Sequence, residues 1–188
     1  FPDTEPALTA RMKAVGEVMA IGRTFKESLQ KAIRSLEVKA QGLGFGGPKD
    51  DSSALSLELI RDKVRVPSSQ RLFFVRHAFR RGMTIDEVYD LSKIDPWFLD
   101  NIKQLVEEEE RIPAAGGVEA VDQLDLLRYK QLGYSDGQLA KAWGSDEVTV
   151  RERRKALGVE ATFKLVDTCA AEFEAFTPYY YSTYEYED

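Results

Sequence analysis

Two stretches of the sequence have residue types and spacings that occur in nucleotide-binding or metal sites. Each of them also has a purely structural interpretation. Residues 42–47 fit the pattern G-x-G-x-x-G, which binds a dinucleotide pyrophosphate when it connects a strand to a helix. Here the pattern follows a predicted helix and precedes Pro48, so a flexible linker over 41–53 is favoured. Residues 107–110 supply four glutamates, but consecutive helical side chains point in different directions. A solvated helix end is therefore favoured there over a metal site.

His77 and Cys169 are the single histidine and the single cysteine of the 188 residues. One cysteine forms no intrachain disulfide, and this pair falls short of the four ligands of a usual zinc site. His77 lies among Val75, Ala78 and Phe79, and no serine, cysteine or aspartate is spaced as its local partner for nucleophilic catalysis. The sequence predicts a packing or surface histidine, a small buried cysteine, no catalytic residue and no metal site.

The segment 134–159 resembles a DNA-reading helix-turn-helix. Its second predicted helix, near 149–155, carries four basic residues that would face phosphates and bases, namely Arg151, Arg153, Arg154 and Lys155. Acidic residues interrupt this basic set, whereas a DNA-binding domain usually presents a continuous basic face. A structural helical hairpin is therefore favoured, and a nucleic-acid-binding module is kept as the alternative function. A stand-alone nucleotide-binding domain is a third, weaker interpretation.

The charge of the chain is unevenly distributed along the sequence. The chain has 26 Lys and Arg against 32 Asp and Glu, a formal net charge of −6. Residues 167–188 contain acids but no Lys or Arg, so the preceding 166 residues are balanced. The longest run without charged residues, 175–184, is far shorter than the roughly 20 residues of a membrane span. The sequence predicts a folded domain without a secretion signal, a membrane partner or a nucleic-acid partner.

Helix start signals recur through the middle of the chain. Residues 24–27, 84–87 and 135–138 each have the Ser/Thr-x-x-Glu/Gln pattern of a capping box. The second and third boxes each follow a glycine, and the shared pattern recurs with a period near 51 residues. Such a repeat predicts two related helix-turn-helix units.

Both ends of the chain are predicted to be extended. Residues 13–23 are short, apolar and interrupted by glycine, which favours a buried strand over a helix. Five of the eight tyrosines lie within 179–186, a composition that favours an extended segment against a partner surface. The predicted fold class is therefore mainly α, an irregular bundle of helix-turn-helix units with short extended segments at both termini.

Several segments, in matching order, resemble the large subunit of carbamoyl-phosphate synthetase. They are residues 12–24 with 27–32, 94–99, and 166–173 with 181–185, and together they span nearly the whole chain. In that family a helical oligomerisation domain lies between two ATP-grasp halves, and this implies a division of the present chain into three parts.

By this resemblance, residues 1–36 end the first, carboxyphosphate-forming half. Residues 37–165 form the helical oligomerisation domain, and residues 166–188 are the linker into the second, carbamoyl-phosphate-forming half. The glycine-interrupted start, the helical body and the aromatic tail of the sequence match these three parts.

The resemblance also implies an activity for the complete enzyme. That enzyme is a cytoplasmic ligase that makes carbamoyl phosphate from bicarbonate, glutamine-derived ammonia and two ATP, with Mg²⁺ and K⁺, for arginine or pyrimidine biosynthesis. Its implied partners are the two ATP-grasp halves of the same chain, a glutaminase small subunit and further copies of itself. The present chain is too short to hold either nucleotide site, so we expect it to contain no cofactor and to be inactive alone.

Four residues are the candidates for functional contacts. Glu17 matches a family glutamate that lines the tunnel for carbamate, and a loop glutamate at a domain seam is the alternative. In the predicted helix 54–64, Leu55 and Leu59 share one face, and Leu57 and Ile60 fall off it. Leu55, Leu57 and Ile60 are the candidates for contact with a second copy. Packing of this helix on its neighbours within the chain is the alternative.

Overall fold

The computed structural model describes residues 7–10, 13, 17–36, 38–45, 51–170, 172–174 and 179–185. Eight helices and one two-stranded antiparallel sheet are found within these residues, which confirms the predicted mainly α fold. The helices are α1 (Phe25–Ser35), α2 (Leu57–Arg65), α3 (Arg71–Arg80), α4 (Ile85–Ser92), α5 (Pro96–Ala114), α6 (Gln123–Gln131), α7 (Asp136–Trp143) and α8 (Glu147–Ala156). The strands are β1 (Thr162–Leu165) and β2 (Tyr180–Thr183), and Thr162 lies opposite Thr183.

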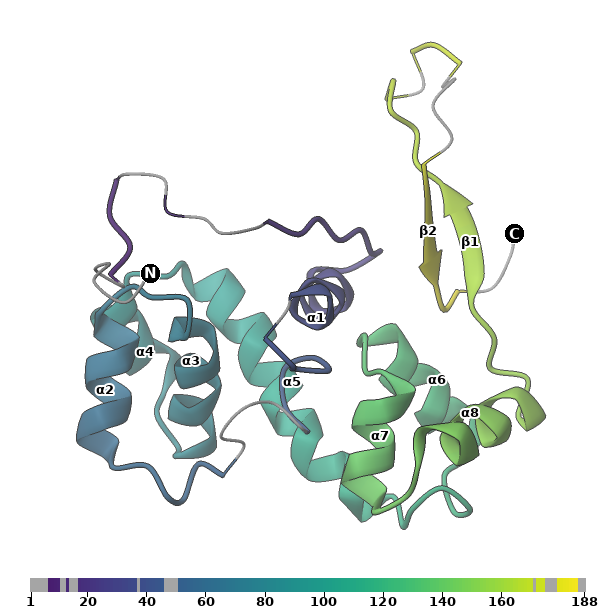
Figure 1. Ribbon diagram of the computed structural model, residues 1–188, viewed down its shortest axis with the longest axis horizontal. Coiled ribbons are helices and arrows are strands. Elements are labelled where there is room, and N and C mark those ends of the chain that lie inside the picture. Colours follow the sequence, from purple (N-terminus) through teal and green to yellow (C-terminus); the bar gives the residue numbers. More distant parts are fainter. Residues whose placement is uncertain are drawn as a thin grey trace.

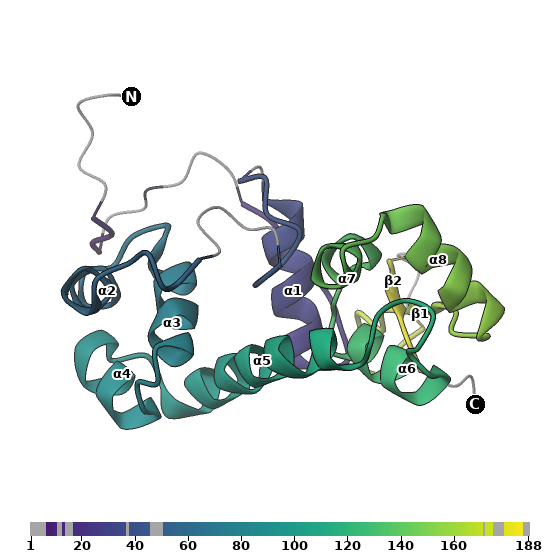
Figure 2. The same ribbon diagram turned by 90° about the horizontal axis from the view of Figure 1, so that it is seen from below.

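The long helix α5 connects two groups of helices. Helices α2, α3 and α4 pack around its beginning, and α6, α7 and α8 follow its end (Figure 1). Helix α1 packs against α5 between the two groups, as Figure 2 shows from below. The β1–β2 hairpin projects from the end that holds α6 and α8. The expected extended tail thus exists, and it pairs with β1 from the end of the helical body.

The two groups repeat the same local structure, as the sequence predicted. In each, a helix ends at a glycine of positive φ, a capping box starts the next helix, and that helix ends at a left-handed residue. The corresponding residues are Gly82 and Gly133, Thr84 and Ser135, Glu87 and Gln138, Lys93 and Gly144, and Asp95 and Asp146. We call α2, α3, α4 and the start of α5 the first unit, and the end of α5 with α6, α7 and α8 the second unit.

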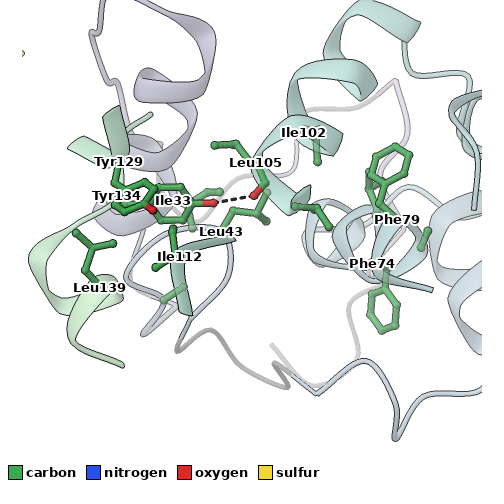
Figure 3. Close-up of a cluster of buried hydrophobic side chains, with 14 of the residues drawn as sticks. Ile33, Leu43, Phe74, Phe79, Ile102, Leu105, Ile112, Tyr129, Tyr134 and Leu139 are labelled. Carbon is green, nitrogen blue, oxygen red and sulfur yellow. Dashed lines mark hydrogen bonds between the residues drawn. The ribbon is translucent and has the colours of Figure 1, made fainter. Parts of the chain in front are cut away.

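One core of buried side chains runs through both units along α5. Ile102, Leu105 and Ile112 of α5 are at most 3% exposed and face both groups of helices (Figure 3). The Tyr134 hydroxyl, in the turn before α7, donates a 2.7 Å hydrogen bond to the Leu105 carbonyl. This bond ties the second unit to the spine of the molecule.

The prediction of a flexible linker over 41–53 is wrong for its described beginning. Leu43 is completely buried, and its backbone is held by Gln30 of α1, whose side chain accepts from the Leu43 amide at 2.7 Å. Gln138 of α7 donates to the Leu43 carbonyl at 3.1 Å. Gly44 passes so close to α5 that an added Cβ would lie 2.3 Å from Glu109 Oε1. The glycines therefore permit close packing of the backbone rather than mobility.

The start of the chain also differs from its prediction. The described residues 17–24 contain no strand, and Met19 is 89% exposed. The apolar run before α1 therefore lies on the surface of the described structure. Gly16 and its neighbours 14–15 lie outside the described residues.

The glutamates 107–110 are not a uniformly solvated helix end. Glu108 and Glu109 are 4% and 2% exposed, and each is neutralised by arginine. Glu109 binds Arg76 and Arg80 of α3, and Glu108 binds Arg128 of α6. These two carboxylates are buried because α3 of the first unit and α6 of the second unit supply arginines that bind them against α5.

Candidate functional site: a junction on α1 and an exposed face of α2

Helix α1 carries a largely buried ion pair where the segment before the helix meets the segment that contains β2. Glu27 is 2% exposed, and its carboxylate lies 2.8 Å from the Lys31 ammonium one turn along the helix. Thr24 caps the helix by accepting from the Glu27 amide at 3.2 Å. The local sequence thus places Glu27 in the first turn of α1, where a carboxylate is favoured by the helix dipole.

The ion pair binds the segment that precedes α1. The Arg23 amide donates to Glu27 Oε2 at 2.8 Å, and Lys31 donates to the Ile21 carbonyl at 3.0 Å. The chain before α1 is therefore turned back along the helix and held at two backbone positions.

The same ion pair binds the segment that follows the hairpin loop. The Thr183 hydroxyl donates to Glu27 Oε2 at 3.2 Å, and Lys31 donates to the Ser182 carbonyl. Arg23 also forms an ion pair of 2.9 Å with Glu185. We call the contacts of Glu27 and Lys31 with segments 21–23 and 182–183, together with the Arg23–Glu185 pair, the junction. It joins parts of the chain that are some 160 residues apart.

Tyr184 completes the attachment of the tail through a buried charged cluster. Its ring lies 5.2 Å from the Lys130 ammonium and 5.6 Å from the Arg154 guanidinium. Asp136 lies between these cations, 2.7 Å from Lys130 and 3.2 Å from Arg154. Gln131 donates to the Tyr184 carbonyl at 2.9 Å. An aromatic ring over two cations is an attractive contact, and it is stronger where water is excluded.

The environment of this cluster shifts the pKa values of Lys130 and Asp136. Burial lowers the pKa of Lys130 to about 8, although Asp136 partly opposes the shift. Burial alone would raise the pKa of Asp136, but the charges of Lys130 and Arg154 outweigh it and hold that pKa below its ordinary value. The cluster therefore keeps its carboxylate ionised between two cations.

Glu17 lies on the surface in the stretch that leads to the junction. Its side chain is exposed and has no ion pair within the described residues. The structure therefore places this candidate upstream of Ile21 and Arg23, without a hydrogen bond or ion pair to the described residues of α1 or the tail.

The three candidates for contact with a second copy have different surroundings. Leu57 is 43% exposed on α2, whereas Leu55 packs partly buried against the core. Ile60 is completely buried, so its proposed contact with a second copy is wrong. Ile60 and Val64, one turn apart, form the inner face of α2, whereas Leu59 of the predicted pair is exposed and Leu55 precedes the helix.

Two exposed apolar residues near α2 were not predicted. Leu59 is 39% exposed and Val66 is 41% exposed. Leu59, two residues after Leu57, lies roughly 160° from it around the helix axis. Val66 directly follows the last residue of α2. Helix α2 therefore presents apolar side chains in two outward directions.

The basic residues of the helix-turn-helix are used within the chain. Helices α7 and α8 form the predicted hairpin, but Arg154 is 9% exposed and binds Asp136. Arg153 donates to backbone carbonyls, and Arg151 pairs with Glu147. The helical hairpin is thus structural, and no observation on residues 134–159 supports the nucleic-acid-binding alternative.

The remaining candidates also have structural surroundings. His77 is 2% exposed and shares a 2.7 Å hydrogen bond with Ser52, which agrees with the predicted packing histidine. Cys169 is half-buried rather than buried. The described residues bring together no group of three or more His, Cys, Asp or Glu side chains that suits a metal ion. None of the helices in the described part of the chain has the length and apolar character needed to cross a membrane.

Comparison with known proteins places the chain in a family. Residues 17–158 match the family described as carbamoyl-phosphate synthetase large chain, oligomerisation domain. The whole chain is 51% identical to the carbamoyl phosphate synthase large chain of Archaeoglobus fulgidus and covers 18% of it. It is 51% identical over 98% of its length to the carbamoyl phosphate synthase large chain, N-terminal section, of Aquifex aeolicus, and covers 32% of that protein.

A third relative carries a more specific name. It is the chloroplastic, arginine-specific carbamoyl phosphate synthase large chain of rice, Oryza sativa, which is 47% identical over the whole chain, with 16% of the rice protein covered. The chain thus spans about a sixth to a third of the length of these relatives. The match to the family and the identity of about one half agree with the resemblance seen in the sequence. The chain belongs to the carbamoyl-phosphate synthetase large-chain family and contains its oligomerisation domain.

Proposed function

We propose that this chain connects the two catalytic halves of a carbamoyl-phosphate synthase large chain and associates with further copies of itself. The observation that carries the connecting role is the junction. Lys31 donates to one carbonyl before α1 and to one carbonyl after the hairpin loop, so a single side chain binds both flanking segments. A rigid helical body with both flanks bound to it fixes the relative position of whatever the flanks connect.

In this proposal the three parts of the chain keep the boundaries expected from the sequence. Residues 1–36 end the carboxyphosphate-forming half, 37–165 are the oligomerisation domain, and 166–188 lead into the carbamoyl-phosphate-forming half. Helix α1 belongs by sequence to the first part but packs on α5 of the second. We regard this packing as the contact that attaches the first half to the helical body.

The complete enzyme is proposed to make carbamoyl phosphate from bicarbonate, glutamine-derived ammonia and two ATP. The names of the relatives support this activity. We assign ATP, Mg²⁺ and K⁺, and contact with the glutaminase subunit, to parts of the large chain beyond this region. The rice relative supports a role in arginine synthesis. A role in pyrimidine synthesis and a cytoplasmic location are proposed from the resemblance alone.

Self-association is proposed to depend on Leu57. Replacing Leu57 with aspartate is expected to raise the dissociation constant of the oligomer by about 30-fold or more, because it places a charge in an apolar contact. Sedimentation velocity of the variant and of the parent chain measures this change. Leu124→Asp is the matched control, since Leu124 is a 71% exposed leucine on α6, away from α2. An unchanged oligomer in Leu57→Asp would contradict the proposal.

Glu17 is proposed to line the passage for carbamate in the complete enzyme. Replacing it with glutamine is expected to increase the ATP hydrolysed per carbamoyl phosphate several-fold, because a labile intermediate is lost when its enclosure is disturbed. The ratio is measured on the complete enzyme by assaying both products. Met19→Ala, in the same exposed stretch, is the control. Normal coupling in Glu17→Gln would show that this residue is only a surface glutamate.

A further inference from the structure

Gly82 and Gly133 occupy equivalent positions in the two units, but only Gly133 is covered by another helix. Gly133 of the second unit is covered by α1, and an added Cβ would lie 2.8 Å from Gln30 Cβ and 2.9 Å from Glu27 Cα. At the corresponding Gly82 of the first unit, an added Cβ would meet nothing within 4 Å. The repeat therefore contains the same surface twice, covered by a helix in one unit and open in the other.

The surface at Gly82 is part of a groove. In the second unit, the surface beside Gly133 is occupied by α1 and by Tyr184, and a pocket of only about 200 Å³ remains. In the first unit, a pocket of about 520 Å³ lies between the start of α4 and the middle of α5. We call it the α4–α5 groove. Its apolar lining comes from Phe79, Met83, Ile85 and Val106.

The charges of the α4–α5 groove select the kind of occupant. Asp86, Glu107 and Glu110 line it together with Lys103, which pairs with Glu107. Asp86 and Glu110 have no ion pair within the described residues. The lining therefore carries a net charge of about −2 around an apolar centre. A helix with an exposed apolar side chain next to basic side chains is complementary to it.

Helix α2 presents such a face. Leu57, Arg61 and Arg65 follow one another at intervals of four residues, so they form a continuous row along the helix. All three are exposed, and among the described residues Arg61 forms one ion pair, a 3.4 Å contact with Glu87. Arg65 has no ion pair within the described part of the chain. The row is apolar at its beginning and basic along the rest.

We propose that the α4–α5 groove receives α2 of a second copy of this chain, with Leu57 against the apolar lining and Arg61 and Arg65 near the acidic residues. The proposal rests on the proposed self-association through Leu57 and names the surface that Leu57 contacts. Because each copy carries both the groove and the helix, a two-fold pair makes the contact twice. In the first unit, α2 of another copy would thus cover the groove, as α1 covers the equivalent surface in the second unit.

Exchange of two charges tests this contact. Glu110→Arg and Arg65→Glu are each expected to raise the dissociation constant of the oligomer about tenfold or more, since like charges then face each other in both contacts. An equimolar mixture of the two variants is expected to return to within about threefold of the parent, because one contact is then unchanged and the other has exchanged charges. Sedimentation velocity at low salt measures association, and circular dichroism confirms that each variant is folded.

The outcomes separate this contact from self-association in general. Glu119→Arg, a charge reversal at an exposed loop residue, is the control and is expected to associate like the parent. If Glu110→Arg associates normally, or if the mixture is not restored, the α4–α5 groove is not the receiving surface. If Leu57→Asp is nevertheless dissociated, self-association through α2 stands without the groove. A parent chain that is monomeric at high concentration would overturn both proposals.

Discussion

Replacing Glu109 with glutamine is expected to lower the free energy of unfolding by about 3–5 kcal/mol. Glu109 has a fully buried side chain and binds Arg76, whose side chain is 4% exposed, with Nε–Oε1 and Nη2–Oε2 distances of 2.8 and 2.6 Å. Arg80 adds a further hydrogen bond of 3.0 Å to Glu109 Oε2. The amide keeps the shape of the carboxylate but removes the negative charge that Arg76 and Arg80 bind. Removing one partner of a buried ion pair costs more free energy than the pair itself contributes.

Urea unfolding of the parent and the variant measures this effect. Glu110→Gln is the matched control, because Glu110 is the next residue on α5 and is exposed. Its expected change is within about 0.5 kcal/mol. A loss below 1 kcal/mol in Glu109→Gln would show that the buried pair is not needed to hold α3 on α5.

Replacing Asp136 with asparagine is expected to destabilise the chain by a similar amount, about 3–5 kcal/mol. The carboxylate lies between Lys130 and Arg154, which are 6% and 9% exposed. Without it, two buried cations face each other below the ring of Tyr184. We therefore expect the tail to loosen together with the second unit, seen as faster hydrogen exchange in β2. Asp125→Asn on α6, at a side chain that is 46% exposed, is the control.

The pH dependence of the free energy of unfolding tests whether the charge of Asp136 acts on the pKa of Lys130. The pKa of Lys130 is about 8 in the folded chain, below its ordinary value of 10.5, so the unfolded chain binds more protons between these pH values. Stability contributed by this group therefore rises as the pH increases from 8 toward 10. In Asp136→Asn the pKa of Lys130 falls further, and the rise is expected to begin below pH 8. A rise that begins at the same pH in both proteins would contradict the assigned coupling.

Local signals in the sequence are enough to predict the helices and their repeat. A capping box needs only residues three positions apart, and both Thr84 with Glu87 and Ser135 with Gln138 form it as predicted. The glycine before each box ends the preceding helix at positive φ. Because these interactions join residues that are close together in the sequence, they do not depend on how the helices pack.

Burial depends on contacts that sequence patterns do not contain. Leu59 and Ile60 are neighbouring aliphatic residues of α2, and only the positions of α3 and α4 decide that Ile60 is inside and Leu59 is exposed. Glu109 is buried because two arginines reach it from α3, more than 28 residues away in sequence. A run of glutamates carries no local sign of such partners.

The junction could not have been predicted either. Glu27 has a clear local role in the first turn of α1, but its bond with Thr183 joins residues 156 positions apart. Nothing in the spacing of Glu27 and Lys31 distinguishes them from an ordinary helical ion pair. Their function in holding both flanks follows only from the packing of the tail against α1.

A distance measurement between the two flanking segments shows whether the helical body holds both of them in one fixed arrangement. Spin labels at cysteines replacing Met19 and Tyr180, both exposed, report that distance by double electron–electron resonance in a chain carrying Cys169→Ser. We predict one narrow distribution, which broadens when Lys31→Met removes the donor shared by Ile21 and Ser182. A broad distribution with Lys31 intact would contradict the account.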